Sequence, residues 1–433
     1  MTTSQYFDAT QFISQESLPS VFANLHLNEQ NSINSSFIHR FFRTQFITLL
    51  KNIKNGHITL NDSIGSTTFG DSNHELKCEI TIYDLNSYTK IALGGSNGSA
   101  QAYIDGLWSS DDPTALIRII IRNRDVLNAM ESGLSSFAQT TLKVWHSLNR
   151  NSKQGSKKNI AAHYDLGNDF FKLFLDSRMM YSSALYQYGD DLESASKRKL
   201  ERICNTLKLT PNDHVIEVGT GWGGFACFAA KTVGCKVTTV TISQEQHNEA
   251  ISQVKQQGLE TLVSVKLQDY RDIEGQYDKL VSIEMIEAVG HQYLDGYFDK
   301  IDSLLKENGT ALVQAIVIDD TQYQRALKEV DYIKRYIFPG SFIPCYEIIT
   351  KTADQNNLAV DEIFDMGLSY AQTLRDWRKL FYQNLDQIKA QGYDAQFLRM
   401  WEFYLCYCEG GFDEQAISVG QISFSKKTFN SKC

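Results

Sequence analysis

A glycine-rich turn that follows an apolar run is the feature of this sequence with the clearest chemical meaning. The run 215–218, Val-Ile-Glu-Val, is followed by glycines at 219, 221, 223 and 224 and then by the apolar stretch 225–230. This order predicts a buried strand, a tight turn and the start of a helix. Glycine lets the backbone approach a ligand closely, and a helix N-terminus offers unpaired N–H groups. The sequence therefore predicts a nucleotide-type site.

The glycine spacing distinguishes between nucleotides. A dinucleotide fingerprint reads G-x-G-x-x-G, with an acidic residue about 20 positions later. Here Glu217 stands two places before Gly219, and the pattern E-x-G-x-G-x-G is the form that class I methyltransferases use for S-adenosylmethionine (SAM). No Lys-Ser/Thr pair follows, which excludes a phosphate-binding P-loop. NAD or FAD, and a purely structural turn, remain as alternatives to SAM.

Other polar side chains follow later apolar runs, which end near Val218, Thr241, Leu267, Glu284 and Ile318. In open α/β sheets, ligands bind beyond the carboxyl ends of the strands. Thr241 and Gln246 are neutral groups that could hold a ribose, although Thr241 and Ser243 also suit a helix N-cap. Asp269 and Tyr270 follow the third run, where the adenine of a nucleotide normally rests.

Two carboxylates, Glu284 and Glu287, lie three residues apart in an apolar setting after the fourth run. A carboxylate in such a place is costly unless it is paired, so a functional role is the natural interpretation. The fifth run adds Gln314 and Ile316 at the same edge of the predicted sheet.

The elements that must position these residues form an α/β pattern from about residue 160 onward. Helical stretches at 222–232, 244–257 and 293–306 alternate with the apolar runs, which predicts a mostly parallel sheet. Asn308-Gly309 is interpreted as a helix stop before the fifth strand. The segment 319–357 is an insertion of the kind that often forms a lid. Helices at about 370–391 and 394–409 and a late strand at 417–424 complete the pattern.

The chain divides into an N-terminal α+β domain at 1–150, a polar and basic linker at 151–160 and a catalytic domain at 161–433. The N-terminal part includes a strand near 80–83 and an amphipathic helix at 37–53. That helix fits either a packed position or a membrane surface.

Composition excludes several classes of protein. The 433 residues are 42% hydrophobic and 21% charged, as in ordinary globular proteins, and a net charge of −9 argues against nucleic-acid binding. Contact with an anionic membrane would therefore need a local basic or apolar patch. We expect no secretory signal and no transmembrane helix. The eight scattered cysteines form no C-x-x-C pair, so we expect no metal site and reduced, cytoplasmic thiols.

Seven motifs in consistent order resemble the cyclopropane fatty acid synthase family, including the mycolic acid cyclopropane synthases. They are HYDLGNDFF with MMYSSALY (163–171 and 179–186), the glycine turn with Trp222, VTIS-x-EQ (240–246), QDYRD (268–272), EMIEAVG (284–290), YIFPG (336–340) and YCEGGF (407–412). The segment 103–108 is a weaker N-terminal marker.

The resemblance implies a class I SAM-methyltransferase sheet with helical lid insertions and a hydrophobic acyl tunnel. It implies transfer of a methylene from SAM across a cis double bond of an unsaturated phospholipid acyl chain. Such an enzyme would be cytoplasmic and peripherally associated with the inner face of the membrane, and it could form a homodimer. The expected cofactor-binding residues are Tyr181, Ser182, Glu217, Gly219, Gly221, Gly223, Thr241, Gln246, Asp269 and Tyr270.

The resemblance also implies catalytic residues. Methyl transfer to an alkene leaves a carbocation, for which Tyr181, Tyr270, Tyr370 and Glu287 are candidate stabilisers. In the family a bound bicarbonate removes a proton, and Glu287, Ile316 and Tyr370 match positions that hold it. Cys408 matches a cysteine often assigned as catalytic, although an inert buried thiol is the commoner case in an apolar helix.

Two positions depart from the family pattern. Ser183 stands where many members have Cys, and Gln314 stands where they have His. Both can still hydrogen-bond to an anion, but the imidazole is lost. The alternative function is therefore a fatty-acyl C-methyltransferase whose product is methyl-branched, methylated and unsaturated, or a furan precursor. A non-catalytic lipid- or SAM-binding protein and a methyltransferase for soluble small molecules are the remaining hypotheses.

Overall fold

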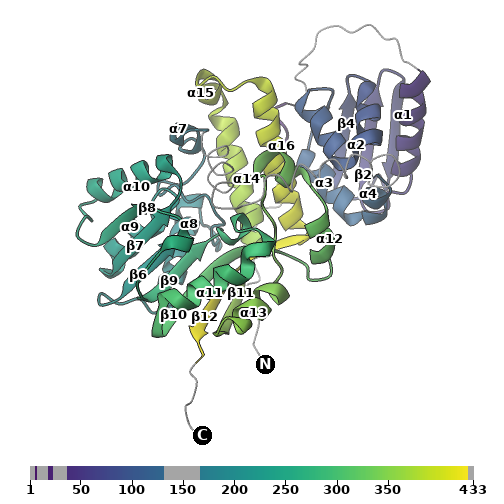
Figure 1. The fold of residues 1–433 in the computed structure, drawn as a ribbon. Coiled ribbons are helices and arrows are strands. Elements are labelled where there is room, and N and C mark those ends of the chain that lie inside the picture. Colours follow the sequence, from purple (N-terminus) through teal and green to yellow (C-terminus); the bar gives the residue numbers. More distant parts are fainter. Residues whose placement is uncertain (1–4, 7–17, 23–36, 131–165, 428–433) are drawn as a thin grey trace.

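The computed structural model describes residues 5–6, 18–22, 37–130 and 166–427 (Figure 1). The expected linker at 151–160 and the start of the first motif, residues 163–165, lie outside the described residues. Two separate sheets are present, and the long helices α14 (Gly367–Gln383) and α16 (Ala395–Asp413) lie between them.

The larger sheet has eight strands in the order β1-β11-β12-β10-β9-β6-β7-β8. Strand β12 is antiparallel to both of its neighbours, and the other pairs are parallel. The strands are β1 Gln5–Tyr6, β6 His214–Val218, β7 Lys236–Thr241, β8 Val263–Leu267, β9 Tyr277–Ile283, β10 Leu305–Ile318, β11 Leu358–Asp365 and β12 Ile417–Lys426.

Chain order reverses beside β6, since β7 lies on one side of it and β9 on the other. Ligand crevices of open α/β sheets form at such a switch point. The glycine turn leaves β6 at this place and enters the first helix of the crossover, as predicted. The helices around this sheet are α7 Asn168–Phe171, α8 Leu192–Thr206, α9 Gly224–Val233, α10 Gln244–Gln256, α11 Leu294–Leu304 and α13 Tyr346–Gln355.

Two predicted boundaries are wrong. Strand β10 starts at Leu305, before Asn308-Gly309, and its register shifts between Leu305 and Thr310. The helix expected at 370–391 is two helices, α14 Gly367–Gln383 and α15 Leu385–Ala390. They separate at Asn384, whose amide donates to the carbonyl oxygens of Leu173 and Leu380.

The insertion predicted at 319–357 is helical. It contains α12 Tyr323–Lys328, the π-helical turn η4 Ile333–Ile337, and α13. Its helix α12 lies on the side that faces the N-terminal unit, whereas α13 packs beside α11 and β11 (Figure 1).

The N-terminal sheet has the order β3-β2-β4-β5. Its strands are β2 His57–Asp62, β3 Gly65–Gly70, β4 Lys77–Ile82 and β5 Trp108–Ser110, and its helices are α1 Phe37–Leu50, α2 Asn86–Ile104, α3 Pro113–Arg122 and α4 Arg124–Met130. In α1 only Leu50 is fully buried, whereas Phe37 is 84% exposed.

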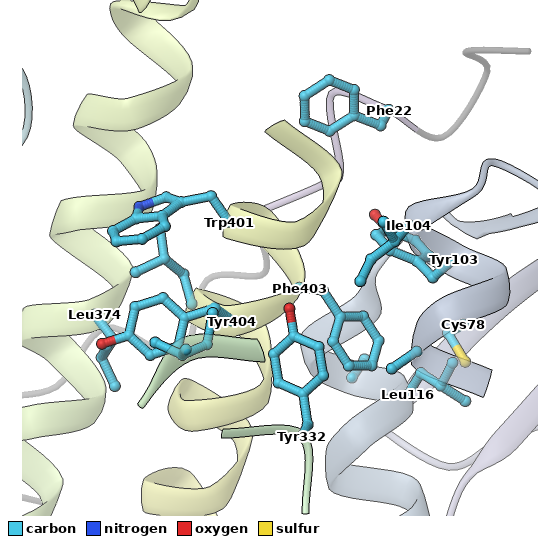
Figure 2. Close-up of a cluster of buried hydrophobic side chains, with 14 of the residues drawn as sticks. Phe22, Cys78, Tyr103, Ile104, Leu116, Tyr332, Leu374, Trp401, Phe403 and Tyr404 are labelled. Atoms are coloured by element: carbon cyan, nitrogen blue, oxygen red, sulfur yellow. The ribbon is translucent and has the colours of Figure 1, made fainter. Parts of the chain in front are cut away.

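The long helix α16, Ala395–Asp413, joins the two sheets (Figure 1). Figure 2 shows Phe403 of this helix between Tyr103 and Tyr332, with ring centroids 5.2 and 4.9 Å away. The guanidinium group of Arg399 donates to the carbonyl oxygens of Tyr103 and Trp108, each at 2.6 Å. These contacts bury α16 against the N-terminal sheet and fix both units around one interior.

Candidate active site

The glycine turn has the backbone geometry that only glycine adopts easily. The φ angles of Gly219, Gly221 and Gly223 are 98°, 51° and 91°. A Cβ atom added to Gly221 would meet no atom within 4 Å, so the turn leaves open space there. A Cβ atom at Gly223 would lie 3.2 Å from the Cβ atom of Ala250, so that glycine serves helix packing.

A cavity of about 610 Å³ begins at this turn and reaches the N-terminal sheet. It contains Gly219 and Gly221 at one end and Ile80 and Ile82 of β4 at the other. The predicted site residues that line it are Tyr181, Ser182, Glu217, Gly219, Gly221, Thr241, Gln246, Asp269, Tyr270, Glu287, Ile316, Tyr370 and Cys408. Ser183, Gln314 and Gly223 are not among the lining residues.

The cofactor end of the cavity offers polar groups of the expected kind. Glu217 is 2% exposed, its Oε2 atom has no partner, and burial raises its pKa to about 8. Thr241 Oγ1 donates to Gln246 Oε1 at 2.9 Å, so a neutral pair follows β7. Asp269 accepts from Arg271 at 2.6 and 2.8 Å. An unpartnered buried carboxylate beside open space at the glycine turn fits a polar, cationic ligand such as SAM.

Glu284 is the centre of the polar network next to the cofactor end. Its Oε1 atom accepts from Ser183 N at 2.9 Å and from Gln314 Nε2 at 2.8 Å, and its Oε2 atom accepts from the Tyr370 hydroxyl at 2.8 Å. Its φ of 47° is unusual for a residue other than glycine. Glu284 was not among the residues predicted to be catalytic, although its position three residues before Glu287 was a visible signal.

Glu287 has a different environment. Its Oε1 atom accepts from the backbone N–H of Ile316 at 2.5 Å, and its Oε2 atom has no partner. Burial, and secondarily the charge of Glu284, raise its pKa to about 8. The residues predicted to hold bicarbonate therefore bind two different carboxylates. Tyr370 donates a hydrogen bond to Glu284, and the backbone N–H of Ile316 donates one to Glu287.

Bicarbonate does not fit this arrangement. An anion needs hydrogen-bond donors, and the donors of Ser183, Gln314, Tyr370 and Ile316 already bind carboxylates. A second anion between Glu284 and Glu287 would also face like charge.

The two departures from the family pattern lie behind Glu284. Ser183 and Gln314 are fully buried. The Ser183 hydroxyl donates to the carbonyl oxygen of Ala184, and Gln314 Oε1 accepts from Gln421 at 3.0 Å. Both residues support Glu284 rather than facing the cavity.

Lys199 of α8 is a buried cation that the sequence interpretation missed. It is fully buried, and its ammonium group donates to Ser182 Oγ at 2.7 Å. Burial lowers its pKa to about 8, while the charges of Glu284, Asp176 and Glu217 oppose that shift. A lysine on the apolar face of a helix, between Ala195 and Ile203, was the available signal.

Aromatic side chains and a thiol form the wall beyond the carboxylates. The hydroxyls of Tyr181 and Tyr404 are 2.9 Å apart, and the Tyr181 ring stacks on Trp377 with centroids 5.2 Å apart. Burial raises the pKa of Cys408 far above its ordinary value, so the thiol is protonated at neutral pH. A thiolate role for Cys408 has no physical support here, and its catalytic assignment stays a prediction.

The described residues contain no cluster of three or more His, Cys, Asp or Glu side chains that could hold a metal ion. Within the same part of the chain, no helix is long and apolar enough to cross a membrane. The cysteines at described positions are free.

Comparisons with known proteins agree with the fold. The family model described as "Mycolic acid cyclopropane synthetase" matches residues 151–422. Tuberculostearic acid methyltransferase UfaA1 of Mycobacterium tuberculosis is 35% identical over 341 residues, covering 77% of this chain and 79% of that protein. Cyclopropane-fatty-acyl-phospholipid synthase of Escherichia coli K12 is 32% identical over 360 residues, covering 83% of this chain and 90% of that protein.

A solved structure, mycolic acid cyclopropane synthase CmaA1 complexed with SAH and CTAB, superposes with a TM-score of 0.59 and 28% identity. The match covers 62% of this chain and 98% of that one. The predicted class I SAM-methyltransferase fold is thereby confirmed.

Proposed function

The chain belongs to the mycolic acid cyclopropane synthetase family of SAM-dependent methyltransferases, and on this premise we propose that it methylates a cis double bond in an unsaturated acyl chain of a phospholipid. The observation that carries the proposal is the continuous cavity. It joins the glycine turn to an apolar chamber, with Glu284 and Glu287 between them. The name of one relative, cyclopropane-fatty-acyl-phospholipid synthase, refers to a fatty-acyl phospholipid, which supports the choice of an acyl chain.

The residues fit the demands of this reaction. SAM supplies a methyl group on a sulfonium when it is bound. An alkene is a weak nucleophile, so the cavity must hold the double bond close to the glycine turn and in line with it. The carbon–sulfur bond breaks as a carbon–carbon bond forms, which leaves positive charge on the acyl chain. The rings of Tyr181 and Tyr370 and the carboxylate of Glu284 can stabilise that charge where water is excluded.

A proton must then leave the cation. Glu284 uses both oxygens to accept hydrogen bonds, whereas Glu287 keeps Oε2 without a partner. With its pKa raised to about 8, Glu287 is a stronger base than an ordinary carboxylate once it is ionised, and the positive charge that develops beside it favours the ionised form. We therefore assign proton removal to Glu287 and cation stabilisation to Glu284.

Two products are compatible with this chemistry. Loss of a proton from the transferred carbon closes a cyclopropane ring, and the retained Glu287–Ile316 pair supports this first candidate. Loss of a proton from a neighbouring acyl carbon gives a methylated unsaturated chain. The carboxylate of Glu284, at the centre of the donors expected to hold bicarbonate, supports this second candidate. Location at the cytoplasmic face of the membrane and a homodimer stay predictions.

The test is expression in a host that lacks its own cyclopropane synthase, followed by gas chromatography–mass spectrometry of the fatty acids. Both products gain one CH₂, and resistance to mild hydrogenation identifies the ring. The Glu287→Gln variant tests the assignment of the base, because it separates SAM binding from turnover. We expect its SAM affinity to stay within about twofold of the wild type while turnover falls by about 10²–10⁴.

The outcomes separate the parts of the proposal. Wild-type protein that binds SAM but leaves every lipid unchanged would refute the function. Near-normal turnover of Glu287→Gln would refute the assignment of the base.

A further inference from the structure

The cavity has a mouth between the N-terminal unit and the helical insertion, where its exposed lining residues lie. Among its lining residues only Arg124, Asn128 and Arg325 are exposed, and the others are buried or half-buried. Arg124 and Asn128 belong to α4, and Arg325 belongs to α12, so this mouth is made by two segments far apart in the sequence (Figure 1).

A hydrogen bond holds the two sides of the mouth together. Arg325 Nη1 donates to Asn128 Oδ1 at 2.8 Å, and Arg325 Nε donates to Glu329 Oε1 at 2.8 Å. The buried ammonium of Lys334 donates to the carbonyl oxygens of Ala326 and Glu329, which fixes the end of α12. The Arg325 guanidinium is therefore paired with Asn128 across the entrance and with Glu329 beside it.

The cavity wall changes from apolar to cationic toward this mouth. Along α3 and α4 the lining residues follow a helical spacing: Ile117, Ile120, Ile121, Arg124, Leu127 and Asn128. Isoleucines therefore face the interior, and a guanidinium group follows them at the entrance. Glu329 and Asp331 also line the cavity near α12, so the mouth carries both signs of charge.

From this arrangement we propose that the mouth between α4 and α12 binds the phosphate of the phospholipid whose acyl chain occupies the cavity. Guanidinium groups match phosphate oxygens in geometry and charge, and an apolar channel that ends in two of them suits an anionic amphiphile. The inference rests on the proposed function and names the part of the substrate that the catalytic centre does not touch. The family match begins at residue 151, so Arg124 is an addition of the N-terminal unit to that core.

The decisive variants are Arg124→Gln and the double variant Arg124→Gln with Arg325→Gln. With vesicles of unsaturated phosphatidylglycerol, we expect the KM for lipid to rise about tenfold for each arginine removed, with kcat within about twofold. The SAM dissociation constant should not change. The charge-matched control is Lys231→Gln with Lys255→Gln, on the exposed surface of α9 and α10. An equal rise in KM for this control would show general attraction to the vesicle and overturn the proposal.

Binding of soluble dihexanoyl phosphatidylglycerol, measured by calorimetry, tests the site without any turnover. Wild-type binding that weakens in Arg124→Gln supports the phosphate site even if the proposed reaction fails. Arg124→Gln keeps the bond between Arg325 and Asn128, so loss of that contact cannot explain the result. Unchanged binding in both variants would overturn the proposal.

A free unsaturated fatty acid distinguishes the two sources of an anionic head. If the arginine variants bind the fatty acid as the wild type does, the guanidinium groups recognise phosphate. If they lose the fatty acid and keep the phospholipid, the mouth recognises a carboxylate, which overturns the assignment.

Discussion

Glu217 and Glu287 both have one buried carboxyl oxygen that lacks a partner, yet Glu217 serves the cofactor end of the cavity and Glu287 lies between that end and the apolar chamber. A polar atom left unpaired at such depth costs free energy in the ligand-free protein. That cost is recovered when a ligand supplies the missing partner or the missing charge. The same reasoning explains why Glu284, whose oxygens are all used, is better suited to hold charge than to accept a proton.

The first prediction concerns Gly221. Gly221→Val adds a branched side chain to space that is open in the ligand-free protein, at a φ of 51°. We expect SAM binding measured by calorimetry to fall by more than about 100-fold, because the side chain occupies the space needed by the ligand. Gly258→Val is the matched control, since Gly258 has a φ of 67° and equally open surroundings but lies outside the cavity. Equal losses in both variants would point to backbone strain alone.

The second prediction concerns pH. Burial raises the pKa of Glu217 to about 8, so the carboxyl is protonated in the ligand-free protein at lower pH. A cationic ligand favours the ionised form, so binding releases a proton below pH 8. SAM affinity should therefore increase with pH up to about 8, by at most about tenfold per unit for this group. The pH dependence of SAM affinity should be smaller in Glu217→Gln than in the wild type. Glu287 and the amino group of SAM contribute equally to both proteins, so the difference between the two profiles reports Glu217 alone. Identical pH profiles would contradict the role of Glu217.

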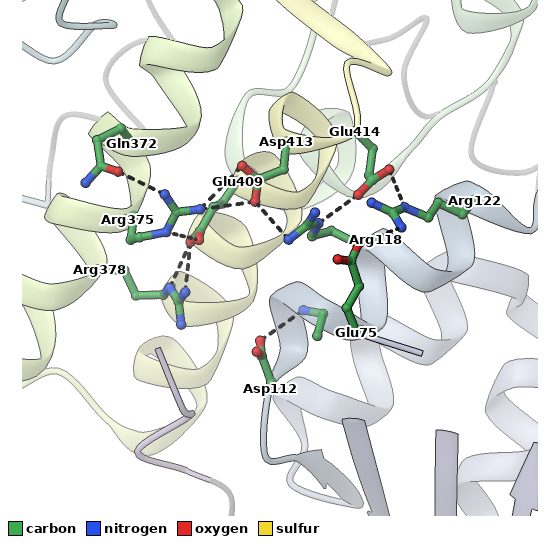
Figure 3. Close-up of polar contacts among 11 residues, drawn as sticks. Glu75, Asp112, Arg118, Arg122, Gln372, Arg375, Arg378, Glu409, Asp413 and Glu414 are labelled. Carbon is green, nitrogen blue, oxygen red and sulfur yellow. Dashed lines mark hydrogen bonds and ion pairs between the residues drawn. The ribbon is translucent and has the colours of Figure 1, made fainter. Parts of the chain in front are cut away.

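At the scale of elements, α14 and α16 carry both the cavity wall and the ionic contacts between the two units. Figure 3 shows Arg375 and Arg378 of α14 converging on Glu409 of α16, with ion-pair distances of 3.0 and 2.9 Å. Glu414, just beyond α16, accepts from Arg118 and Arg122 of α3, each at 2.7 Å. Buried ion pairs thus join α14 to α16, and half-buried ion pairs join the end of α16 to the N-terminal unit.

The third prediction tests the buried ion pairs between α14 and α16. Glu409→Gln leaves Arg378, whose side chain is 1% exposed, without its carboxylate. An uncompensated buried charge costs about 3–5 kcal/mol, so the urea midpoint should fall clearly. Glu201→Gln is the control, because the pair of Glu201 with Lys197 is solvent-exposed and such pairs contribute about 0–1 kcal/mol. Equal shifts of the two midpoints would contradict the prediction.

At the scale of the whole molecule, the exposed apolar face of α1 contrasts with a net charge of −9. Phe37, Ile38 and Phe41 are 84%, 55% and 50% exposed, and the sequence of α1 contains no acidic residue. This helix also contributes Phe46 and Leu50 to the cavity lining. The inner face of α1 packs as one interpretation predicted, since Leu50 is in the core and Phe42, Phe46 and Ile47 pack against it. Contact of its outer aromatic patch, at the edge of the molecule (Figure 1), with a membrane stays a prediction.

The fourth prediction follows for a lipid substrate. Phe37→Ser with Phe41→Ser should reduce co-sedimentation with anionic vesicles by more than about tenfold, because each inserted aromatic side chain contributes about 1.5–3 kcal/mol. SAM affinity should stay unchanged. Ile251→Ser is the control, since Ile251 is 44% exposed on α10, at the other end of the molecule (Figure 1). Full vesicle binding by the double variant would exclude α1 as the membrane contact.

Local patterns in the sequence predicted the alternation of strands and helices from β6 to β10 and the position of the glycine turn, but not β1, whose residues were assigned to the N-terminal domain and pair with β11 of the large sheet. Hydrophobic period and turn chemistry act over a few residues, so the ends of β6, β7 and β8 follow from them. They failed at Asn384, because the group that helps to end α14 there is the carbonyl oxygen of Leu173, which is distant in the sequence. The start of β10 was missed for a similar reason, since pairing with β9 decides it.

The sequence also determined which residues form the cofactor end of the cavity, since Glu217, Gly219 and Gly221 are neighbours along the chain. Only the tertiary structure decided that Tyr370, Gln314 and Ser183 all bind Glu284, and that Arg124 and Arg325 share one entrance. Spacing along a chain specifies which side chains lie together on one strand or helix. Which carboxylate receives a distant donor depends on how the elements pack, and that packing is set by the whole interior at once.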